Sequence, residues 1–286
     1  RFQVGEVTRT DVAQAEASLA TGEADVSLAE ARLQQSLAAY RRYIGVEPKR
    51  LQPAQPIEKL LPRSLDLAVA TGLSENPAIV GALHAVDVAE AAVKVAEGKL
   101  GPTVSVVGQV SNSTDTSGYP GYSVFQASIG GQLTMPLYQG GAEYAAIRSA
   151  KEQLSQARLA VESARYQVRA AIVSSWGQLQ SARAQIVSFQ SAVKAAEIAL
   201  TGVREEAKVG QRTTLDVLNQ EQTLLNTRVE LVTAQHDRVV FSYAVMAAIG
   251  RLTAHDLGLG VVAYDPNQHF ELTRNRFFGI DTPDGR

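Results

Sequence analysis

The four histidines are the side chains with the widest chemical repertoire, and they are scattered along the chain at positions 84, 236, 255 and 269. Their spacing matches no set of metal ligands, so we expect no metal site. The serines lie in no nucleophile-elbow pattern, and no glycine-rich phosphate loop follows a strand. Cysteine is absent, which excludes disulfides and cysteine–zinc sites. We therefore predict a protein that is not an enzyme and that holds no cofactor.

Two short motifs place a threonine three residues before an aspartate. They are Thr8-x-x-Asp11 and Thr213-x-x-Asp216. In this spacing, a capping box, the two side chains accept hydrogen bonds from free backbone N–H groups in the first turn of a helix. Gly5 and Gly210 precede the motifs, and glycine tolerates the positive φ that a turn needs. Each motif therefore predicts a turn followed by the start of a helix.

The composition favours close-packed helices over a compact globular core. The 286 residues carry a formal charge of −2 and a sequence pI near 6.2, so we expect no nucleic-acid partner. Aromatic residues make up only 6% of the chain while alanine is abundant. No run of about 18 apolar residues occurs, so we expect no transmembrane helix. We also expect a processed or truncated chain, because it opens within an element and without a signal peptide.

An internal repeat links the two ends of the chain. Shifting the sequence by 205 residues lays 4–45 on 209–250 without a gap, with 11 identities over 42 positions. The identities include both bounds, Val4-Gly5 on Val209-Gly210 and Ile44-Gly45 on Ile249-Gly250. By this arithmetic the segment from about 64 to 205 should have a counterpart before Arg1. We therefore expect that most of a first repeat is missing.

Two segments, 103–112 and 125–135, alternate in polarity as the strands of a hairpin do. The apolar set is Val104, Val106, Val110, Phe125, Ala127, Ile129, Leu133 and Met135. The polar set is Thr103, Ser105, Gln109, Ser111, Gln126, Ser128, Gln132 and Thr134. A turn-rich loop, 111–122, joins them. About ten alternating residues per strand match a tilted membrane strand.

A soluble antiparallel hairpin with one face on a core would alternate in the same way. Two strands, however, cannot close a barrel or bury their own edges. The flanking helices must then pack elsewhere, or several chains must pool their hairpins. The length of the neighbouring helix favours pooling.

That helix is predicted from 142 to 206, where no proline interrupts about 65 residues, or roughly 98 Å at 1.5 Å per residue. Apolar residues recur at spacings of three and four, as in a coiled coil, with an 11-residue step through Ala171, Ser175, Leu179 and Ala182. Asn76-Pro77 predicts the start of a second helix, 77–99, and a third is expected at 213–249. Two shorter antiparallel helices would then cover the long one.

Together with the family resemblance given next, these elements predict a mainly α fold class, with long antiparallel coiled-coil helices of an α-barrel, one amphipathic transmembrane hairpin and a mixed mid-height region. The segments are the lower helix of repeat 1 (1–45), an irregular equatorial linker (46–76), an ascending helix (77–101), the hairpin (102–137), a long descending helix (138–206), the tip turn and return helix (207–250), and an equatorial tail of strand or coil (251–286).

The order of these elements resembles the TolC-like outer-membrane efflux proteins. Three kinds of motif carry the resemblance, which covers nearly the whole chain. They are Leu137-Tyr138-Gln139-Gly140-Gly141 at the strand-to-helix exit, Asn76-Pro77 at the ascending helix, and the two helix-turn segments 4–12 and 209–218. The resemblance implies a homotrimer with a 12-stranded barrel in the outer membrane of a Gram-negative bacterium and a helical barrel crossing the periplasm. It also implies contact with outer-membrane lipid, a periplasmic membrane-fusion adaptor, and an inner-membrane pump or ABC transporter of an efflux or type I secretion system.

The resemblance places functional residues at the helix turns, at the periplasmic mouth. Asp11 and Asp216 correspond to acidic and gating positions, and Arg212 to a gating arginine that would bind Asp11 or the Thr10 carbonyl of a neighbouring coil. Capping alone would explain the same aspartates. Arg204 and Gly210 match an adaptor-contact motif, but Ala207 stands where an aromatic residue is usual. Phe2, before Gly5, fills that slot in the first repeat.

Two other functions fit part of the sequence. A soluble structural coiled-coil protein would explain the heptads but not the alternating hairpin. A periplasmic adaptor also carries a helical hairpin, but the lipoyl-like and small β-barrel modules of adaptors are not found. The exported substrate is not encoded in these patterns.

Overall fold

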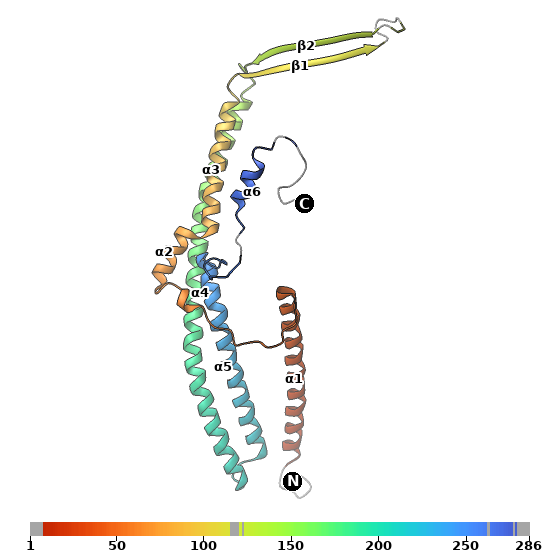
Figure 1. The fold of residues 1–286 in the computed structure, drawn as a ribbon. Coiled ribbons are helices and arrows are strands. Elements are labelled where there is room, and N and C mark those ends of the chain that lie inside the picture. Colours follow the sequence, from red (N-terminus) through yellow and green to blue (C-terminus); the bar gives the residue numbers. More distant parts are fainter. Residues whose placement is uncertain (1–7, 115–119, 122, 262–263, 277, 279–286) are drawn as a thin grey trace. The chain divides into compact units, whose positions relative to one another are not determined.

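The computed structural model describes residues 8–114, 120–121, 123–261, 264–276 and 278, and shows the predicted class, long helices with one antiparallel hairpin (Figure 1). The chain divides into two compact units. The first comprises Arg1–Leu65 and Val173–Ala247, and the second Asp66–Ile172 and Ala248–Arg286. Each unit is described by itself.

In the first unit, the later part of α4 (Ala142–Lys208) pairs with α5 (Thr214–Ile249). Ala196 and Leu200 of α4 are buried with Leu224 of α5, and Val193 and Val217 pack against them. These residues recur at spacings of three and four, so each helix presents one apolar stripe to the other. The pair is therefore a coiled coil, as the heptads predict.

The helix α1 (Arg9–Ile44) is the counterpart of α5 in the internal repeat. Both helices contain 36 residues, and the offset of 205 relates both of their ends. Gly45 and Gly250, which follow them, both have positive φ, of 83° and 96°. The structure thus supports the repeat. The stripe differs in burial, however, because Leu19 is 64% exposed where Leu224 is 8% exposed.

The second unit contains α2 (Leu65–Glu75), α3 (Pro77–Gly98), the earlier part of α4, the hairpin and α6 (Pro266–Thr273). The prediction that 46–76 is irregular is wrong, because α2 and a short 3-10 helix η2 (Glu58–Leu60) lie there. Pro62 lies before α2 and Gly72 lies inside it. The tail contains α6 where strand or coil was expected, and Asp265 caps it through a bond from the Asn267 N–H of 2.9 Å.

Gly72 is helical because its missing side chain allows close packing. A Cβ atom there would lie 2.3 Å from the Ile172 Cδ1 atom and 3.6 Å from Val168. Ile172, Val168 and Ala68 are buried. Tertiary packing against α4 therefore outweighs the low helix propensity of glycine.

The ends of α3 and α5 meet at a second close approach. The Asn76 Oδ1 atom caps α3 by accepting from the Ala78 N–H at 2.9 Å, and its Nδ2 donates to the Ala248 carbonyl at 2.8 Å. A Cβ atom on Gly250 would lie 2.6 Å from Pro77 Cδ and 2.9 Å from Asn76 Cα. One buried amide thus satisfies groups at the end of one helix and the start of another.

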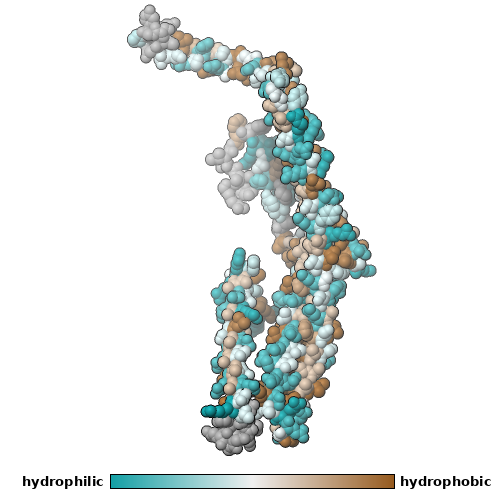
Figure 2. Space-filling model, turned by 180° about the vertical axis from the view of Figure 1, so that it is seen from behind, coloured by the Kyte–Doolittle hydropathy of each residue, from teal (hydrophilic) through white to brown (hydrophobic). Residues whose placement is uncertain are grey.

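The hairpin pairs β1 (Thr103–Thr114) with β2 (Ser123–Thr134). The register places Val104 opposite Leu133 and Val110 opposite Ala127, so the apolar residues share one face as predicted. Strand β1 ends at Thr114, two residues beyond its predicted end at 112. Both faces are exposed, and Figure 2 shows hydrophobic and hydrophilic side chains interspersed along the hairpin.

The buried stripe of α4 confirms the coiled-coil pattern with one correction. Ser175, Leu179 and Ala182 are buried as predicted, but Ile172 is buried in place of Ala171. The two successive steps of four residues therefore lie at Ala164, Val168 and Ile172, seven residues or about two turns earlier than expected. The helix is also long and apolar enough to cross a membrane by length and composition, contrary to the sequence expectation, although core helices of soluble proteins pass the same test.

We expect Gly250→Ala to lower the free energy of unfolding of the full-length protein by about 3 kcal/mol, combining positive-φ strain with overpacking against Asn76 and Pro77. Gly210→Ala is the matched control, because Gly210 also follows a helix with positive φ but has open space around it. It should cost about 1 kcal/mol. Denaturant titrations followed by circular dichroism measure both values, and equal losses would contradict the close-approach argument.

Candidate functional site

The turn between α4 and α5 is built by Gly210. Its φ is 79°, which glycine adopts without steric cost. The Gly210 N–H donates to the Ala207 carbonyl at 3.2 Å, and the Gln211 N–H donates to the Glu206 carbonyl at 2.9 Å. This pair of bonds is the Schellman motif, which satisfies carbonyls at a helix end. Gly210 thus has a structural role whether or not it also contacts a partner.

Thr213 and Asp216 form the predicted capping box. The Asp216 Oδ2 atom accepts from the Thr213 backbone N–H and hydroxyl, both at 2.9 Å, and the Asp216 N–H donates to the Thr213 Oγ1 at 3.1 Å. The bonds from the Thr213 backbone and hydroxyl lower the pKa of Asp216 below its usual value, helped by the positive charge of Arg212. Asp216 is therefore a carboxylate at neutral pH, and it is available both for capping and for an acidic ring.

Arg212 is paired within its own turn. Its Nε atom donates to the Glu206 Oε2 at 2.9 Å, and Glu206 raises the pKa of this guanidinium. Arg204, the other predicted arginine, donates to Glu221 of α5. Lys208 donates to Glu205 at 2.7 Å. These three basic groups of the α4–α5 turn thus each have an acidic partner in the same chain.

The predicted residues of the first repeat are described only in part. Thr10 is exposed in the first turn of α1, and the backbone of Asp11 follows it, while the Asp11 side chain is outside what the structure describes. Phe2 and Gly5 also lie outside the described residues. A link from Arg212 to Thr10 or Asp11 of a neighbouring coil stays a prediction.

A second cluster, which sequence reasoning missed, holds the linker against α4 and α5. Glu58 of η2 receives bidentate bonds from Arg238 of α5, at 2.8 and 3.0 Å, and is bonded by Arg183 of α4 at 2.9 and 3.2 Å. The Glu58 side chain is 18% exposed. Bonds from Arg238 and then Arg183 outweigh desolvation and lower the pKa of Glu58 to about 2. We call Glu58, Arg183 and Arg238 the linker clamp.

A neutral contact supports the linker clamp one residue away. The Ile57 N–H donates to the Ser242 Oγ at 3.1 Å, and the fully buried Ser242 hydroxyl donates to the Val239 carbonyl at 2.7 Å. Glu58 is separated from its two arginines by 125 and 180 residues. No local motif marks such a contact, and the internal repeat has no counterpart for it, so the sequence carried no signal for the linker clamp.

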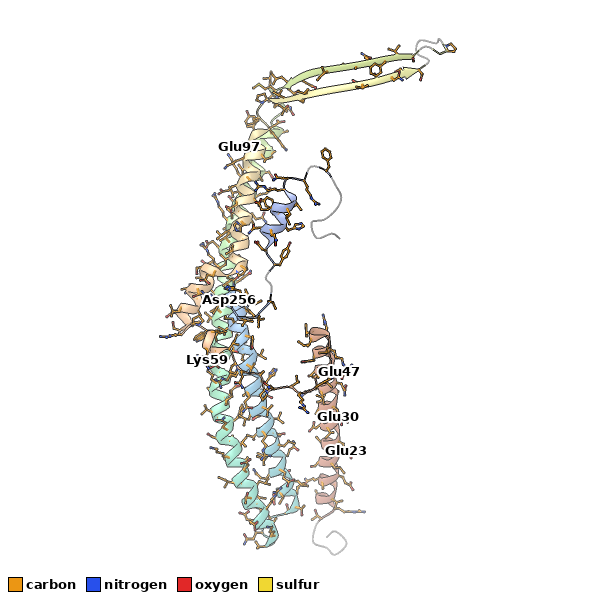
Figure 3. The ribbon with its side chains drawn as sticks, in the orientation of Figure 1. Glu23, Glu30, Glu47, Lys59, Glu97 and Asp256 are labelled. Carbon is orange, nitrogen blue, oxygen red and sulfur yellow. The ribbon has the colours of Figure 1, made fainter. Side chains whose placement is uncertain are left out.

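The described part of the chain contains no candidate metal site. No group of three or more His, Asp or Glu side chains lies close enough there to hold an ion. His84, His236 and His255 each lie beside an aspartate on the surface. Figure 3 shows the acidic side chains Glu23 and Glu30 at separate positions along α1 and, in the second unit, Glu97 on α3.

Comparison with known proteins shows one consistent likeness. The profile of the family described as "Outer membrane efflux protein" matches residues 69–251. The outer membrane efflux protein BepC of Brucella suis biovar 1 (strain 1330) is 44% identical over 286 residues, covering 100% of this chain and 62% of that protein. The outer membrane protein TolC of Escherichia coli (strain K12) is 26% identical over 278 residues, covering 90% of this chain and 55% of TolC.

Solved structures show the same fold. The crystal structure of the outer membrane protein VceC from Vibrio cholerae superposes with a TM-score of 0.67 at 23% identity, covering 87% of this chain and 60% of that chain. The chain therefore spans less than two thirds of the length of these relatives.

For the linker clamp, we expect Glu58→Gln to lower the free energy of unfolding by about 2 kcal/mol at pH 7, because a charged carboxylate between two arginines is replaced by an amide. Because folding lowers this pKa from 4.5 to about 2, the contribution is complete above pH 4.5 and is lost as the pH falls towards 2. Denaturant titrations at several pH values test this. Glu30→Gln on exposed α1 is the control, and an equal effect there would contradict the linker clamp's role.

For the capping box, Thr213→Ala should destabilise the start of α5 by about 1 kcal/mol, since the Asp216 N–H loses its acceptor. Hydrogen exchange of the amides in the first turn of α5 measures the loss. Exchange that stays at the wild-type rate would show that the box contributes nothing.

Proposed function

Because the chain belongs to the outer membrane efflux protein family, we propose that the full-length protein is a protomer of a trimeric duct that exports substrates across the outer membrane and the periplasm. The family consists of efflux proteins, and the chain is not an enzyme. The observation that carries the proposal is the hairpin, whose two faces differ in polarity and are both exposed.

The hairpin supports a membrane role because its apolar face is exposed and its outer edges lack strand neighbours in the described chain. Each strand contains 12 residues, enough for a tilted strand to cross the hydrocarbon core. Its apolar face leaves Val104, Ile129 and Leu133 exposed, which lipid would cover. The outer edges of β1 and β2 lack strand neighbours in the described chain, and strands of other copies or of further sequence would supply them.

The long helix supports the trimer. Opposite its buried stripe, α4 exposes Leu159, Tyr166 and Ile198, with the charged Glu152 on the same line. A helix that is apolar on two opposite sides packs between two neighbours, which is the arrangement in the wall of a helical barrel. We assign the second neighbour to another copy of the protein.

The proposed partners follow from the family and the tip. An adaptor in the periplasm would contact Arg204, Gly210, Phe2 and Gly5, and an inner-membrane pump or ABC transporter would deliver the substrate. In the gate, Asp11 and Asp216 would form acidic rings, and Arg212 would hold neighbouring coils closed through Thr10 or Asp11. The bond from Arg212 to Glu206 keeps this guanidinium at the tip and so supports the assignment.

We expect the full-length protein to fractionate with outer membranes, to need detergent for extraction, and to conduct ions as a trimer in planar lipid bilayers. Fractionation, cross-linking and single-channel recording test these three points. Recovery of the full-length protein as a soluble monomer would contradict the channel proposal and favour a structural coiled-coil protein.

For the gate, Arg212→Ser should raise the open fraction severalfold, because the closed state loses charge-assisted hydrogen bonds. Lys208→Ser is the matched control, since Lys208 is an exposed base at the same tip with its own acidic partner. Single-channel recordings measure the open fraction of both variants. An unchanged open fraction in the Arg212 variant would leave the tip residues with structural roles only.

A further inference from the structure

Between residues 148 and 204, the charges of α4 lie mainly on one side of its buried stripe. Ten of the eleven charged residues in this range directly follow a stripe position, at heptad positions b and e, and the eleventh, Glu152, lies opposite the stripe. The ten are Arg148, Lys151, Arg158, Glu162, Arg165, Arg169, Arg183, Lys194, Glu197 and Arg204. Several bind neighbouring helices, as in the pairs of Lys151 with Glu97 and of Arg158 with Glu90. We call this side the charged flank.

The other side, at heptad positions c and g, carries no charge from Ser149 to Gly202. Its members are exposed and consist of serine, glutamine and alanine, ending in glycine. They are Ser149, Gln153, Gln156, Ala160, Ser163, Gln167, Ala171, Ser174, Gln178, Ser181, Gln185, Ser188, Ala192, Ala195, Ala199 and Gly202. The pattern continues in phase across the 11-residue step, so it follows the buried stripe and not the bare helix. We call it the neutral flank.

In the wall of the proposed duct, the two flanks of α4 remain to form the inner and the outer surface. In the proposed trimer, which this inference presupposes, neighbours cover the buried stripe and the opposite line of Leu159, Tyr166 and Ile198. One flank must then face the duct interior and the other the exterior.

The hairpin decides which flank faces inward. When its apolar face meets lipid, its other face meets the interior. That face contains serine, threonine and glutamine, with Val107, Val124 and Gly130 between them, and no charged residue. Its chemistry is that of the neutral flank.

We propose that the neutral flank of α4 and the polar face of the hairpin together line the duct. The lining offers hydroxyl and amide groups but no fixed charge, so it hydrates the passage without selecting solutes by the sign of their charge. Selection by charge is left to the acidic residues of the tip. The charged flank faces outward.

Single cysteines test this assignment, because the chain contains none of its own. Gln167→Cys and Arg169→Cys lie two residues apart on opposite flanks, and Gln132→Cys and Leu133→Cys lie on opposite faces of β2. All four side chains are exposed, so each variant should fold. The full-length variants are recorded in planar bilayers before and after an anionic methanethiosulfonate reagent is added.

We expect modification to change the conductance of the Gln167→Cys and Gln132→Cys pores and to raise their cation-to-anion permeability ratio about twofold. The Arg169→Cys and Leu133→Cys pores should not respond. A response at position 169, or none at 167, in pores that conduct normally would overturn the neutral lining. Absence of any conductance in the unmodified protein would instead overturn the proposed duct.

Discussion

The approach of the Gly250 backbone to Asn76 and Pro77 constrains how the helices of this chain succeed one another. Two helices meet there, since the Asn76 amide caps α3 and binds the last turn of α5, while Gly250 leaves no side chain between them. Any β-carbon would push these backbones apart. A helix as long as α4 cannot be covered by one partner of ordinary length, so the junction at which one covering helix ends and another begins determines the packing around it.

The ion pairs of this structure differ in how much they contribute to its stability. The pairs of Arg158 with Glu90, Arg204 with Glu221 and Arg228 with Glu197 join exposed side chains of neighbouring helices and stabilise the fold only slightly. The linker clamp differs because Glu58 is largely removed from water and satisfied by two guanidinium groups. It fixes the linker on the α4–α5 pair without any apolar core of its own. At the tip, Arg212 and Asp216 are also charged, but their side chains are accessible to solvent.

The distribution of polarity around α4 connects the fold to the proposed duct. A helix in a soluble bundle buries one stripe and exposes charge on the rest of its surface. Here four sides differ: a buried stripe, an exposed apolar line, a charged flank and a neutral flank. Such a helix suits a wall with a neighbour on each side and a different solvent compartment on each face. The amphipathic hairpin likewise has two faces that differ in polarity.

Local pattern determined much of this protein from sequence alone. Heptad spacing predicted α4 and its partners, alternation predicted the faces of the hairpin, and Thr213-x-x-Asp216 predicted a capping box, because each depends on neighbours within a few residues. The repeat predicted equal lengths for α1 and α5. Tertiary structure alone decided the rest. Helix α2 forms across Gly72 because Ile172 and Val168 pack there, and the linker clamp joins residues up to 180 positions apart, so the free energy of both comes from contacts that no local pattern records.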